Sequence, residues 1–258
     1  AQSGTGKLRG NDFHIDLERA RSLPGYCQCF ACFTTPSQKR AESSAITLFE
    51  KEMAIILGQL DKNSDLIRQA YSAAEIEENR KQGIMSALLT IEGTAGIDYN
   101  PDLLEDLYKI GFRITTLGWN EQNPLTGSCV TGGGLTELGI RYVMEAQKVG
   151  MVVDVSHISD EGFWNIMEIA EKPVIASHSN SRAIWNVPRN LTDDMYRAIC
   201  KTGGTAGINL YSAFLGEEPN IDTVCDHIFH FLNIAGDDKH ISLGADFDGC
   251  DALPVGIN

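Results

Sequence analysis

Apolar residues gather in seven short runs along the chain, and the longer segments between these runs have helical periodicity. Each run is continuously apolar, whereas a strand with one face in water alternates apolar and polar residues. The pattern therefore predicts seven strands that are buried on both faces, as in a parallel sheet. The runs are Cys27–Phe33, Ile84–Glu92, Phe112–Trp119, Met151–His157, Val174–His178, Gly204–Tyr211 and Ile241–Asp246.

Helix-capping residues and glycines divide the remaining segments into helices. Ser72-Ala-Ala-Glu75 predicts a capping box ahead of a helix over Ile76–Gln82, which Gly83 ends. Similar residues bound five further predicted helices, over 102–110, 136–149, 159–172, 192–203 and 222–235. Strands and helices that alternate in this way predict an α/β fold with a parallel sheet. No repeat or linker divides the chain, so we expect residues 1–258 to form a single domain.

Two architectures fit this alternation, a doubly wound sheet and a closed (β/α)8 TIM barrel. A nucleotide-binding doubly wound sheet often has a Gly-rich turn after its first strand, but Thr131-Gly-Gly-Gly134 follows a loop, and we expect it to be a flexible loop itself. Glu92, His157, His178 and Asp246 each end a different apolar run. A barrel builds its active site from such strand ends, which favours the barrel. A closed barrel has eight strands, of which seven are visible.

Composition and charge exclude several classes of protein. The net charge of −14 argues against a nucleic-acid binder, which needs clustered Lys and Arg for phosphates. With 43% apolar and 22% charged residues, the chain has a globular composition and not a disordered one. No apolar run approaches the roughly 18 residues of a membrane-spanning helix, and no signal peptide is visible. We therefore expect a cytoplasmic protein.

The seven cysteines have no repeated paired spacing, and their number is odd. A secreted disulfide framework favours an even number in a shorter chain, so we expect reduced, mostly buried thiols. Cys27, Cys29 and Cys32 lie close enough in sequence to suggest a metal cluster. No partner Cys or His pair stands at zinc-ribbon distance, so we interpret them as part of a buried strand.

Glu92, His157 and His178 are the candidate metal ligands. Both histidines follow a serine at the exit of an apolar run, in Val153-Asp-Val-Ser-His157 and Val174-Ile-Ala-Ser-His178. A polar side chain at such a position needs a partner or a function. One carboxylate and two imidazoles without a thiolate suit Zn²⁺ or another divalent ion in a catalytic site.

Five motifs together resemble the membrane (renal) dipeptidase family of zinc peptidases, peptidase family M19, in a bacterial-type form. The resemblance runs from about Asn11 to Gly249, and the order and spacing of the motifs agree throughout. The motifs are Ile91-Glu92-Gly93, Asp154-Val-Ser-His157, Ser177-His178-Ser179, Val187-Pro-Arg189-Asn190 and Gly244-Ala-Asp246-Phe-Asp248-Gly249.

The resemblance implies a (β/α)8 barrel whose two zinc ions and bridging water hydrolyse dipeptides, and it allows a homodimer. It gives Glu92 the role of bridging the two metals, while His157 and His178 hold the second zinc. Arg189 would bind the free carboxylate of the substrate, and its planar fork suits that group. Asp246 would be a catalytic residue that contacts the substrate. From the residues alone, a surface salt bridge for Arg189 and a turn-capping role for Asp246 stay open.

The sequence departs from the family pattern at the first zinc site. Asp12-Phe-His14-Ile-Asp16 contains a His-x-Asp pair, as that site requires, but Ser3–Asn11 ahead of it is Gly-rich and polar. His14 also precedes Cys27 by too few residues for a first helix. We therefore expect the first strand and its His-x-Asp ligands to lie upstream, with the barrel incomplete at both ends of this sequence.

A second departure concerns the fourth strand, which in well-known members ends in a histidine. Here Trp119 and Asn120 stand in its place, and we expect Trp119 to wall the substrate pocket and Asn120 to contact the substrate. Trp119 cannot replace the charge or proton of an imidazole. Two alternatives to a dipeptidase therefore remain open: a deacetylase-like amide hydrolase, and a relative that binds ligands without turnover.

Overall fold

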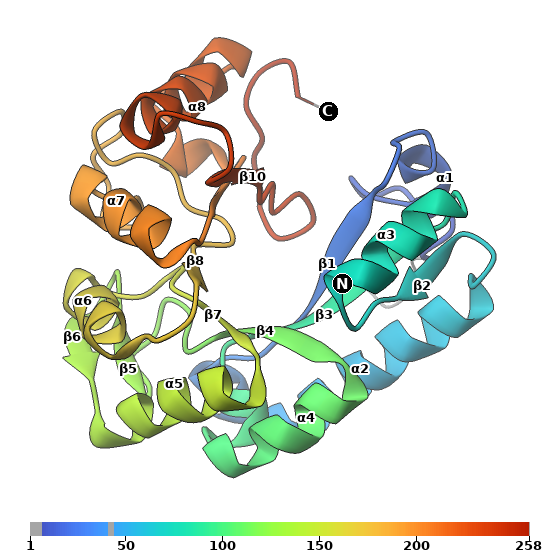
Figure 1. The fold of residues 1–258 in the computed structure, drawn as a ribbon, viewed down its shortest axis with the longest axis horizontal. Coiled ribbons are helices and arrows are strands. Elements are labelled where there is room, and N and C mark those ends of the chain that lie inside the picture. The colour runs from blue at the N-terminus through green and yellow to red at the C-terminus, as the bar shows by residue number, and fades with distance from the viewer. Residues whose placement is uncertain (1–6, 41–43, 258) are drawn as a thin grey trace. The chain divides into compact units, whose positions relative to one another are not determined.

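Parallel strands with helices between them make up both units into which the chain divides (Figure 1). The structure is a computed structural model that describes residues 7–40 and 44–257. The first unit holds the described residues up to 115 together with 149–151, and the second holds 116–148 and the described residues from 152 onward.

The sheet of the first unit is built on β3 (Met85–Glu92). β1 (Cys27–Phe33) pairs with β3 in parallel along its whole length, from Cys27 opposite Ser86 to Phe33 opposite Glu92. The short β2 (Ile67–Gln69) pairs with the beginning of β3, also in parallel, and β4 (Phe112–Thr116) is a further neighbour of β3. β3 is almost entirely buried, which agrees with its continuous apolar run.

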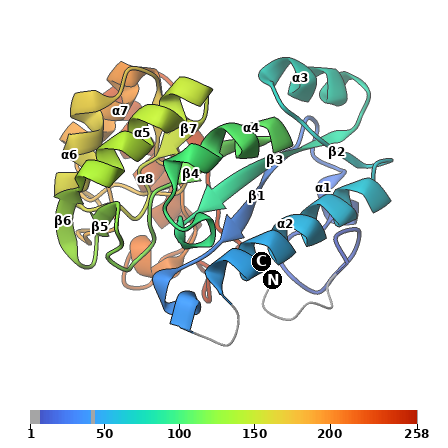
Figure 2. The same cartoon turned by 90° about the horizontal axis from the view of Figure 1, so that it is seen from below.

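Helices cover this sheet, and the longest of them, α2, runs beside β1 (Figure 2). Phe49 of α2 stacks on Phe112 of β4 with ring centroids 5.5 Å apart, so aromatic burial attaches the helix to the sheet. The helices are α1 (Leu17–Ala20), α2 (Ala45–Lys62), α3 (Ala73–Lys81) and α4 (Leu104–Ile110), with 3₁₀ turns at Pro36–Arg40, Ala95–Ile97 and Pro101–Leu103.

The second unit contains four parallel strands, and the ends of some of them are in close backbone contact. β7 (Val152–Asp154) pairs with β8 (Val174–Ile175), and β9 (Ala206–Ile208) pairs with β10 (Ile241–Leu243). A bridge from Ala176 to Ala206 joins the two pairs. A Cβ atom on Gly207 or Gly244 would lie 2.0 or 1.8 Å from the carbonyl oxygen of Ser177. Only glycine fits at these two positions, and the strand ends meet there.

The helices of the second unit follow its strands, as the capping residues predict. Side chains of Ser159, Thr192 and Asn220 accept hydrogen bonds from the first turns of their helices. Tyr196 and Phe231 stack with ring centroids 4.0 Å apart and join two of these helices. The helices are α5 (Glu137–Val149), α6 (Asp160–Ile169), α7 (Asp193–Thr202) and α8 (Ile221–Ala235), with a 3₁₀ turn at Ser212–Phe214.

The seven predicted strands are confirmed, and six predicted helices are present with small differences at their ends. The helix predicted over 102–110 begins as the 3₁₀ turn Pro101–Leu103. Only half of the predicted capping box forms, because Ser72 accepts from Glu75 N whereas the Glu75 carboxylate accepts from Tyr71 N. The long helix α2 and the short strand β2 have no counterpart in the sequence prediction.

The prediction of a flexible loop at Thr131–Gly134 is wrong. Gly132–Leu135 is strand β6, which forms an antiparallel hairpin with β5 (Thr126–Ser128). Ser128 Oγ accepts from the backbone N–H groups of Val130 and Thr131, which closes the turn. Three successive glycines have low strand propensity, so side-chain pattern could not reveal this strand.

Two predictions about burial are also wrong. β10 is largely exposed, with Leu243 78% exposed, and in β1 only Cys32 is buried. All seven cysteines lie in described residues and are free thiols. Cys32 is the buried one, whereas the other six are half-buried or exposed, so the expectation of mostly buried thiols is wrong. Apolar side chains on a short strand predicted the strand correctly but not the depth of its burial.

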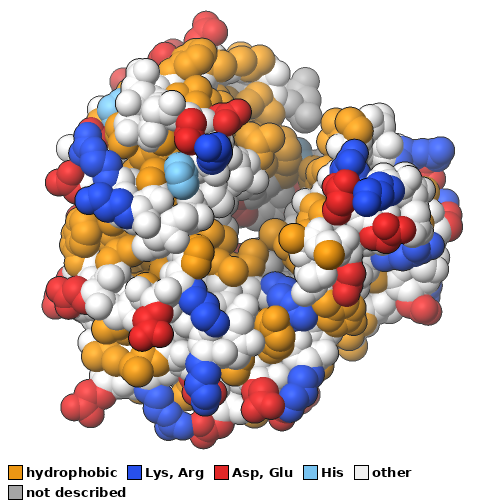
Figure 3. All heavy atoms as spheres, in the orientation of Figure 1, with side chains coloured by type: hydrophobic (Ala, Val, Ile, Leu, Met, Phe, Trp, Pro, Cys, Tyr) orange, Lys and Arg blue, Asp and Glu red, His pale blue; other side chains and the backbone are white. Residues whose placement is uncertain are grey.

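Charged side chains of both signs are interspersed on the face of the molecule shown in Figure 3. Among the described helices, none combines the length and the apolar composition that crossing a membrane requires.

Candidate metal centre

The candidate site residues lie at the carboxyl ends of strands. Glu92 is the last residue of β3 in the first unit. Trp119, His157, His178 and Asp246 belong to the second unit and follow the last residues of β4, β7, β8 and β10, each by three positions. The sequence predicted Trp119, His157, His178 and Asp246 as the last residues of strands, whereas they stand on the turns that follow.

Backbone contacts fix the position of Glu92. Its carbonyl oxygen accepts from Thr34 N at 3.0 Å, which extends the pairing of β3 with β1 by one residue. The next residue, Gly93, has a φ of 77°, and a Cβ there would lie 2.1 Å from Thr34 O. The chain therefore turns sharply after Glu92, and only glycine permits that turn.

A second carboxyl group adds negative charge to this end of the sheet. Glu52 of α2 accepts a hydrogen bond from Phe33 N at 2.9 Å. Burial raises the pKa of Glu52 to about 7, and the negative charge of Glu92 adds to that rise. Two carboxyl groups that disfavour each other's ionisation make this strand end attractive to a cation.

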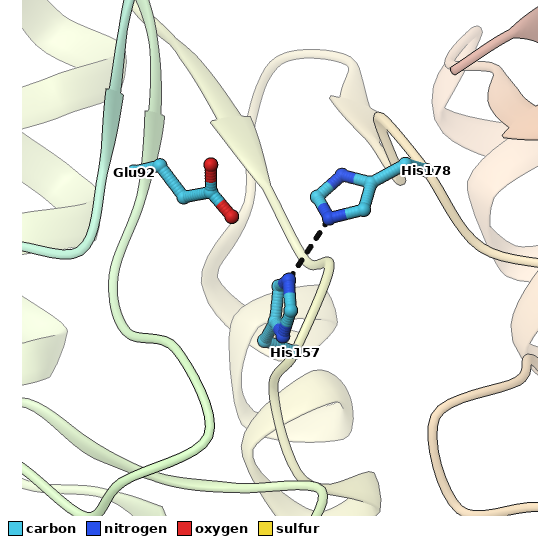
Figure 4. A group of neighbouring side chains, drawn as sticks. All are labelled: Glu92, His157 and His178. Atoms are coloured by element: carbon cyan, nitrogen blue, oxygen red, sulfur yellow. Dashed lines mark hydrogen bonds between the residues drawn. The ribbon is translucent and has the colours of Figure 1, made fainter. Parts of the chain in front are cut away.

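His157 and His178 face each other through their Nε2 atoms, which lie 2.9 Å apart (Figure 4). The ring centroids are 4.9 Å apart and the rings are tilted by 59°. Which of these nitrogens carries a hydrogen follows from the partners of the two Nδ1 atoms.

A serine and an aspartate determine the tautomer of His178. Ser177 Oγ lies 2.5 Å from Asp154 Oδ2 and 2.7 Å from His178 Nδ1. The carboxylate can only accept, so the single hydroxyl hydrogen of Ser177 goes to Asp154. Ser177 Oγ must then accept from His178 Nδ1, which leaves Nε2 of His178 with a lone pair.

Asn120 has the corresponding effect on His157. Asn120 Oδ1 lies 2.9 Å from His157 Nδ1 and can only accept, so His157 Nδ1 carries the hydrogen. With Nδ1 of each ring directed to a protein partner, the two Nε2 atoms face each other across 2.9 Å, so both could bind one cation.

The chemistry of these groups fits a divalent metal ion. Burial holds the pKa of His157 well below its ordinary value, and the positive charge of Arg189 lowers it further, so His157 is neutral, as a ligand must be. His157 and His178, both in the second unit, are described residues whose ring nitrogens could hold a metal ion together. Neutral imidazoles and a carboxylate suit zinc and neighbouring transition metals.

The backbone at His157 is strained and is held from outside the strand. His157 has a φ of 70°, in the left-handed region that favours glycine. Its carbonyl oxygen accepts from Cys129 N at 2.8 Å, and Ser128 Oγ donates to Asn120 O at 2.9 Å. The turn of the β5–β6 hairpin therefore holds both His157 and the residue that fixes its tautomer. Such strain typically marks functional positions.

Arg189 lies in the same surroundings as His157. Its side chain is buried, and Nη1 donates to Ser179 Oγ at 2.5 Å. The guanidinium carbon stands 5.5 Å from the centre of the Phe214 ring. A residue that is only 6% exposed cannot form the surface salt bridge considered above. A buried fixed cation instead suits the recognition of an anionic group.

The loop that carries Arg189 is held on both sides of that residue. Arg182 Nη2 donates to Pro188 O, and Arg182 Nε donates to Asn190 O. A bidentate ion pair with Asp160 holds Arg182 itself, at 2.6 and 2.8 Å. Because the flanking carbonyls are fixed, the Arg189 side chain starts from a defined backbone position.

Trp119 and Asn120 both contact His157. The ring centroids of Trp119 and His157 are 6.1 Å apart. Asn120 is engaged with His157 Nδ1, a contact that the sequence did not suggest. The roles of both residues in substrate binding stay predictions.

Asp246 lies on the turn after β10, and its φ of 58° is again in the left-handed region. Its carbonyl oxygen accepts from Gly249 N at 2.9 Å. Gly244, two residues earlier, packs so closely that a Cβ would lie 3.0 Å from the Cα of His178. The segment that leads to Asp246 therefore runs directly against the segment that carries His178.

Asp16 has a structural role. It is the N-cap of α1, where its carboxylate accepts from Arg19 N and Arg19 Nε, each at 2.8 Å. The hydrogen bond from Arg19 N, followed by that from the Arg19 side chain, holds the pKa of Asp16 below its ordinary value. Residues 7–11, ahead of this pair, form no strand, and residues 1–6 lie outside the described residues. The location of the first zinc site stays a prediction.

We expect Asp16→Ala to lower the free energy of unfolding by about 1 kcal/mol, the usual cost of a lost N-cap, and to leave metal content unchanged. Because the folded pKa is lowered, the carboxylate stabilises the chain above its unfolded pKa of about 3.9 and loses this effect as pH falls through the folded value. Denaturant titration and metal analysis check both points. Asp12→Ala, at an exposed position nearby, is the control. Loss of bound metal in Asp16→Ala alone would show that Asp16 is a ligand.

Sequence reasoning gave no role to Asp154 and Ser177, although both stand in the quoted motifs. A carboxylate within the apolar segment Val153–Val155 had to be buried with partners, and that was the available signal. The partners themselves could not be read from the sequence, because Thr116 and Ser177 lie 38 and 23 positions away.

Residues 7–258 match the model of a family described as membrane dipeptidase, peptidase family M19. A protein of Klebsiella pneumoniae, described as an uncharacterized protein in the pqqA 5′ region, is 35% identical over 218 residues, which are 79% of this chain and 80% of the relative. An uncharacterized dipeptidase of Schizosaccharomyces pombe is 36% identical over 180 residues, which are 67% of this chain and 44% of the relative. The chain thus spans less than half of the yeast protein.

Among solved structures, a metallopeptidase from Rhodobacter sphaeroides, liganded with a phosphinate mimic of the dipeptide L-Ala-D-Ala, is similar with a TM-score of 0.86. Its sequence identity is 25%, and the match covers 96% of this chain and 80% of that one. This likeness confirms the predicted fold class, an α/β fold of the metallopeptidase barrel type.

Proposed function

We propose, from the premise that this chain belongs to the membrane dipeptidase family (peptidase family M19), that it is a metal-dependent dipeptidase. The observation that carries the proposal is the approach of the Nε2 atoms of His157 and His178 to 2.9 Å, each ring being held from its Nδ1 side. Hydrogen-bond partners on the far side of each ring hold both imidazoles in the form that binds a metal.

The metal in this proposal is zinc, with two ions per site. His157 and His178 would hold one of them, and Glu92 would share its carboxylate between the two. When bound, zinc lowers the pKa of water to near neutrality and polarises the bond to be hydrolysed. The left-handed φ of His157 and the turn at Gly93 set the backbone positions from which the proposed ligand side chains extend.

Arg189 would bind the free carboxylate of the dipeptide. Its burial makes this ion pair stronger than one in water, and the Ser179 contact on Nη1 orients the guanidinium plane. Recognition of a carboxylate at one fixed place limits the substrate to short peptides with a free C-terminus. This specificity separates a dipeptidase from a deacetylase-like hydrolase, which needs no such cation.

Three further residues complete the proposed substrate site. Asp246 would contact the substrate as a catalytic carboxylate, since its segment runs against that of His178. Trp119 would wall the pocket beside the His157 ring. Asn120 would contact the substrate through its amide nitrogen, because its Oδ1 is bonded to His157 Nδ1.

Metal removal tests this function. We expect a strong chelator to abolish hydrolysis of free dipeptides, and zinc to restore it, because in this proposal the metal activates the attacking water. The assay measures released amino acids over a panel of dipeptides that includes L-Ala-D-Ala, with metal content measured in parallel. An N-acetylated amino acid serves as the comparison substrate.

Three results would contradict the proposal. Hydrolysis that persists without metal would exclude the metal mechanism. Cleavage of the acetylated compound in preference to dipeptides would favour a deacetylase-like enzyme. Zinc and dipeptide binding without cleavage would favour a non-catalytic binding protein.

A further inference from the structure

Asp154 is a buried carboxylate, only 2% exposed, behind His178 on the side away from His157. We propose that Asp154 and Ser177 are positioning residues that fix the orientation and tautomer of His178 for metal binding. The inference rests on the proposed function in one respect only, that His178 binds metal.

Four donors surround the carboxylate of Asp154. Oδ1 accepts from Ser156 N at 2.9 Å and from Ser177 N at 2.8 Å. Oδ2 accepts from Thr116 Oγ1 at 2.7 Å and from Ser177 Oγ at 2.5 Å. Backbone N–H groups can only donate, so the two bonds to Oδ1 fix which way the carboxylate points.

These bonds join three strand ends at one side chain. Asp154 ends β7, Ser177 stands two positions after β8, and Thr116 ends β4. The aspartate therefore has a structural effect as well, and any test must separate that effect from its action on His178. The separation is possible because the action passes through one hydroxyl hydrogen, that of Ser177.

An isosteric change at Asp154 would reverse this hydrogen. In Asp154→Asn, the backbone N–H groups of Ser156 and Ser177 hold the amide oxygen at the place of Oδ1. The amide nitrogen then takes the place of Oδ2 and donates to Ser177 Oγ. The hydroxyl hydrogen of Ser177 is turned toward His178 Nδ1, which must accept it. The hydrogen of the imidazole moves to Nε2, the atom that should bind the metal.

Ser177→Ala has a milder effect. It removes the acceptor of the Nδ1 hydrogen, so the ring loses its orientation and its preference for one tautomer, but nothing drives the hydrogen to Nε2. Ser177→Thr retains the hydroxyl and should restore the function. The matched control is Ser156→Ala. Ser156 Oγ is buried, accepts from His178 N at 3.1 Å and lies 3.3 Å from Ser177 Oγ, but it is not the partner of Nδ1.

The experiment measures zinc affinity of the full chain by competition with a chelating dye, with thermal unfolding of the metal-free chain in parallel. We expect Ser177→Ala to weaken zinc binding about 10- to 100-fold, the usual effect of losing an outer partner of a ligand. Asp154→Asn should weaken it more than Ser177→Ala does. Ser156→Ala and Ser177→Thr should stay within about threefold of the parent.

Nitrogen chemical shifts of the histidine rings give a second measurement that does not depend on catalysis. In the zinc-loaded parent, His178 should carry its hydrogen on Nδ1. In metal-free Asp154→Asn, the hydrogen should be found on Nε2 of the neutral ring.

Equal loss of zinc affinity in Ser177→Ala and Ser156→Ala, or a His178 hydrogen that stays on Nδ1 in Asp154→Asn, would overturn the inference. If the parent binds zinc and the variants show the expected zinc affinities, but the parent cleaves no dipeptide, only the proposed function is contradicted. A parent that cleaves dipeptides while Ser177→Ala binds zinc as tightly would contradict only the role of Ser177 and Asp154.

Discussion

Replacing His178 by alanine is expected to abolish metal-dependent hydrolysis and to leave the chain folded. The change removes one of the two proposed nitrogen ligands, whose Nε2 atoms lie 2.9 Å apart. A single imidazole on that side cannot hold the ion at working concentrations, so activity should fall by at least about a thousandfold, as expected when a metal centre fails to form. Zinc content, hydrolysis rate and circular dichroism of the variant check these points.

The matched control is His230→Ala. His230 is also a partly buried histidine with a side-chain partner, Asp193 at 2.8 Å, but it stands on α8 away from the strand ends. It should retain metal and activity. If His178→Ala kept the zinc content and the rate of the parent, the metal assignment would be wrong.

The second large effect is expected for Arg189→Ala with a free dipeptide as substrate. Loss of a charge-assisted pair worth about 1.5–3 kcal/mol should lower kcat/KM roughly 10- to 200-fold. A dipeptide amide lacks the carboxylate, so it should be a poor substrate for the parent and almost insensitive to the change. Steady-state kinetics on both substrates measure the difference.

Arg182→Lys helps to separate recognition from loop structure. It keeps a positive charge opposite Asp160 but loses the forked donors that hold Pro188 O and Asn190 O. A displaced loop should harm both substrates in similar proportion. The same proportional loss in Arg189→Ala would show that Arg189 is a structural residue and not the carboxylate clamp.

Much of the fold and part of the site could be predicted from local pattern. Continuous apolar runs predicted each strand that ends at or leads to a candidate site residue, and a serine followed by histidine at two strand exits pointed to His157 and His178 as candidates. Both signals are contained within a few neighbouring residues. Strand ends were overestimated because backbone pairing stops before the apolar run does, at Ile175 in the case of β8.

What escaped prediction depends on partners distant in sequence. Asn120 contacts His157 although the two residues are 37 positions apart in sequence. No sequence pattern around either residue indicates the other as its partner. The strand at Gly132–Leu135 has no side-chain signature, since its pairing with β5 is made by backbone groups alone. The prediction that β10 is buried was wrong for a related reason. The apolar character of a residue such as Leu243 does not tell which other segments cover it.

The hydrogen bond from Cys129 N to His157 O makes one amide hydrogen a natural reporter of the site. That hydrogen can exchange with deuterated water only when the bond breaks, so its exchange rate measures how often the hairpin separates from the turn of His157. A ligand that orders His157 would slow this exchange even if no atom of the fold moved. A single resonance could therefore follow the loading of the site in solution, without a substrate, a chromophore or an added label.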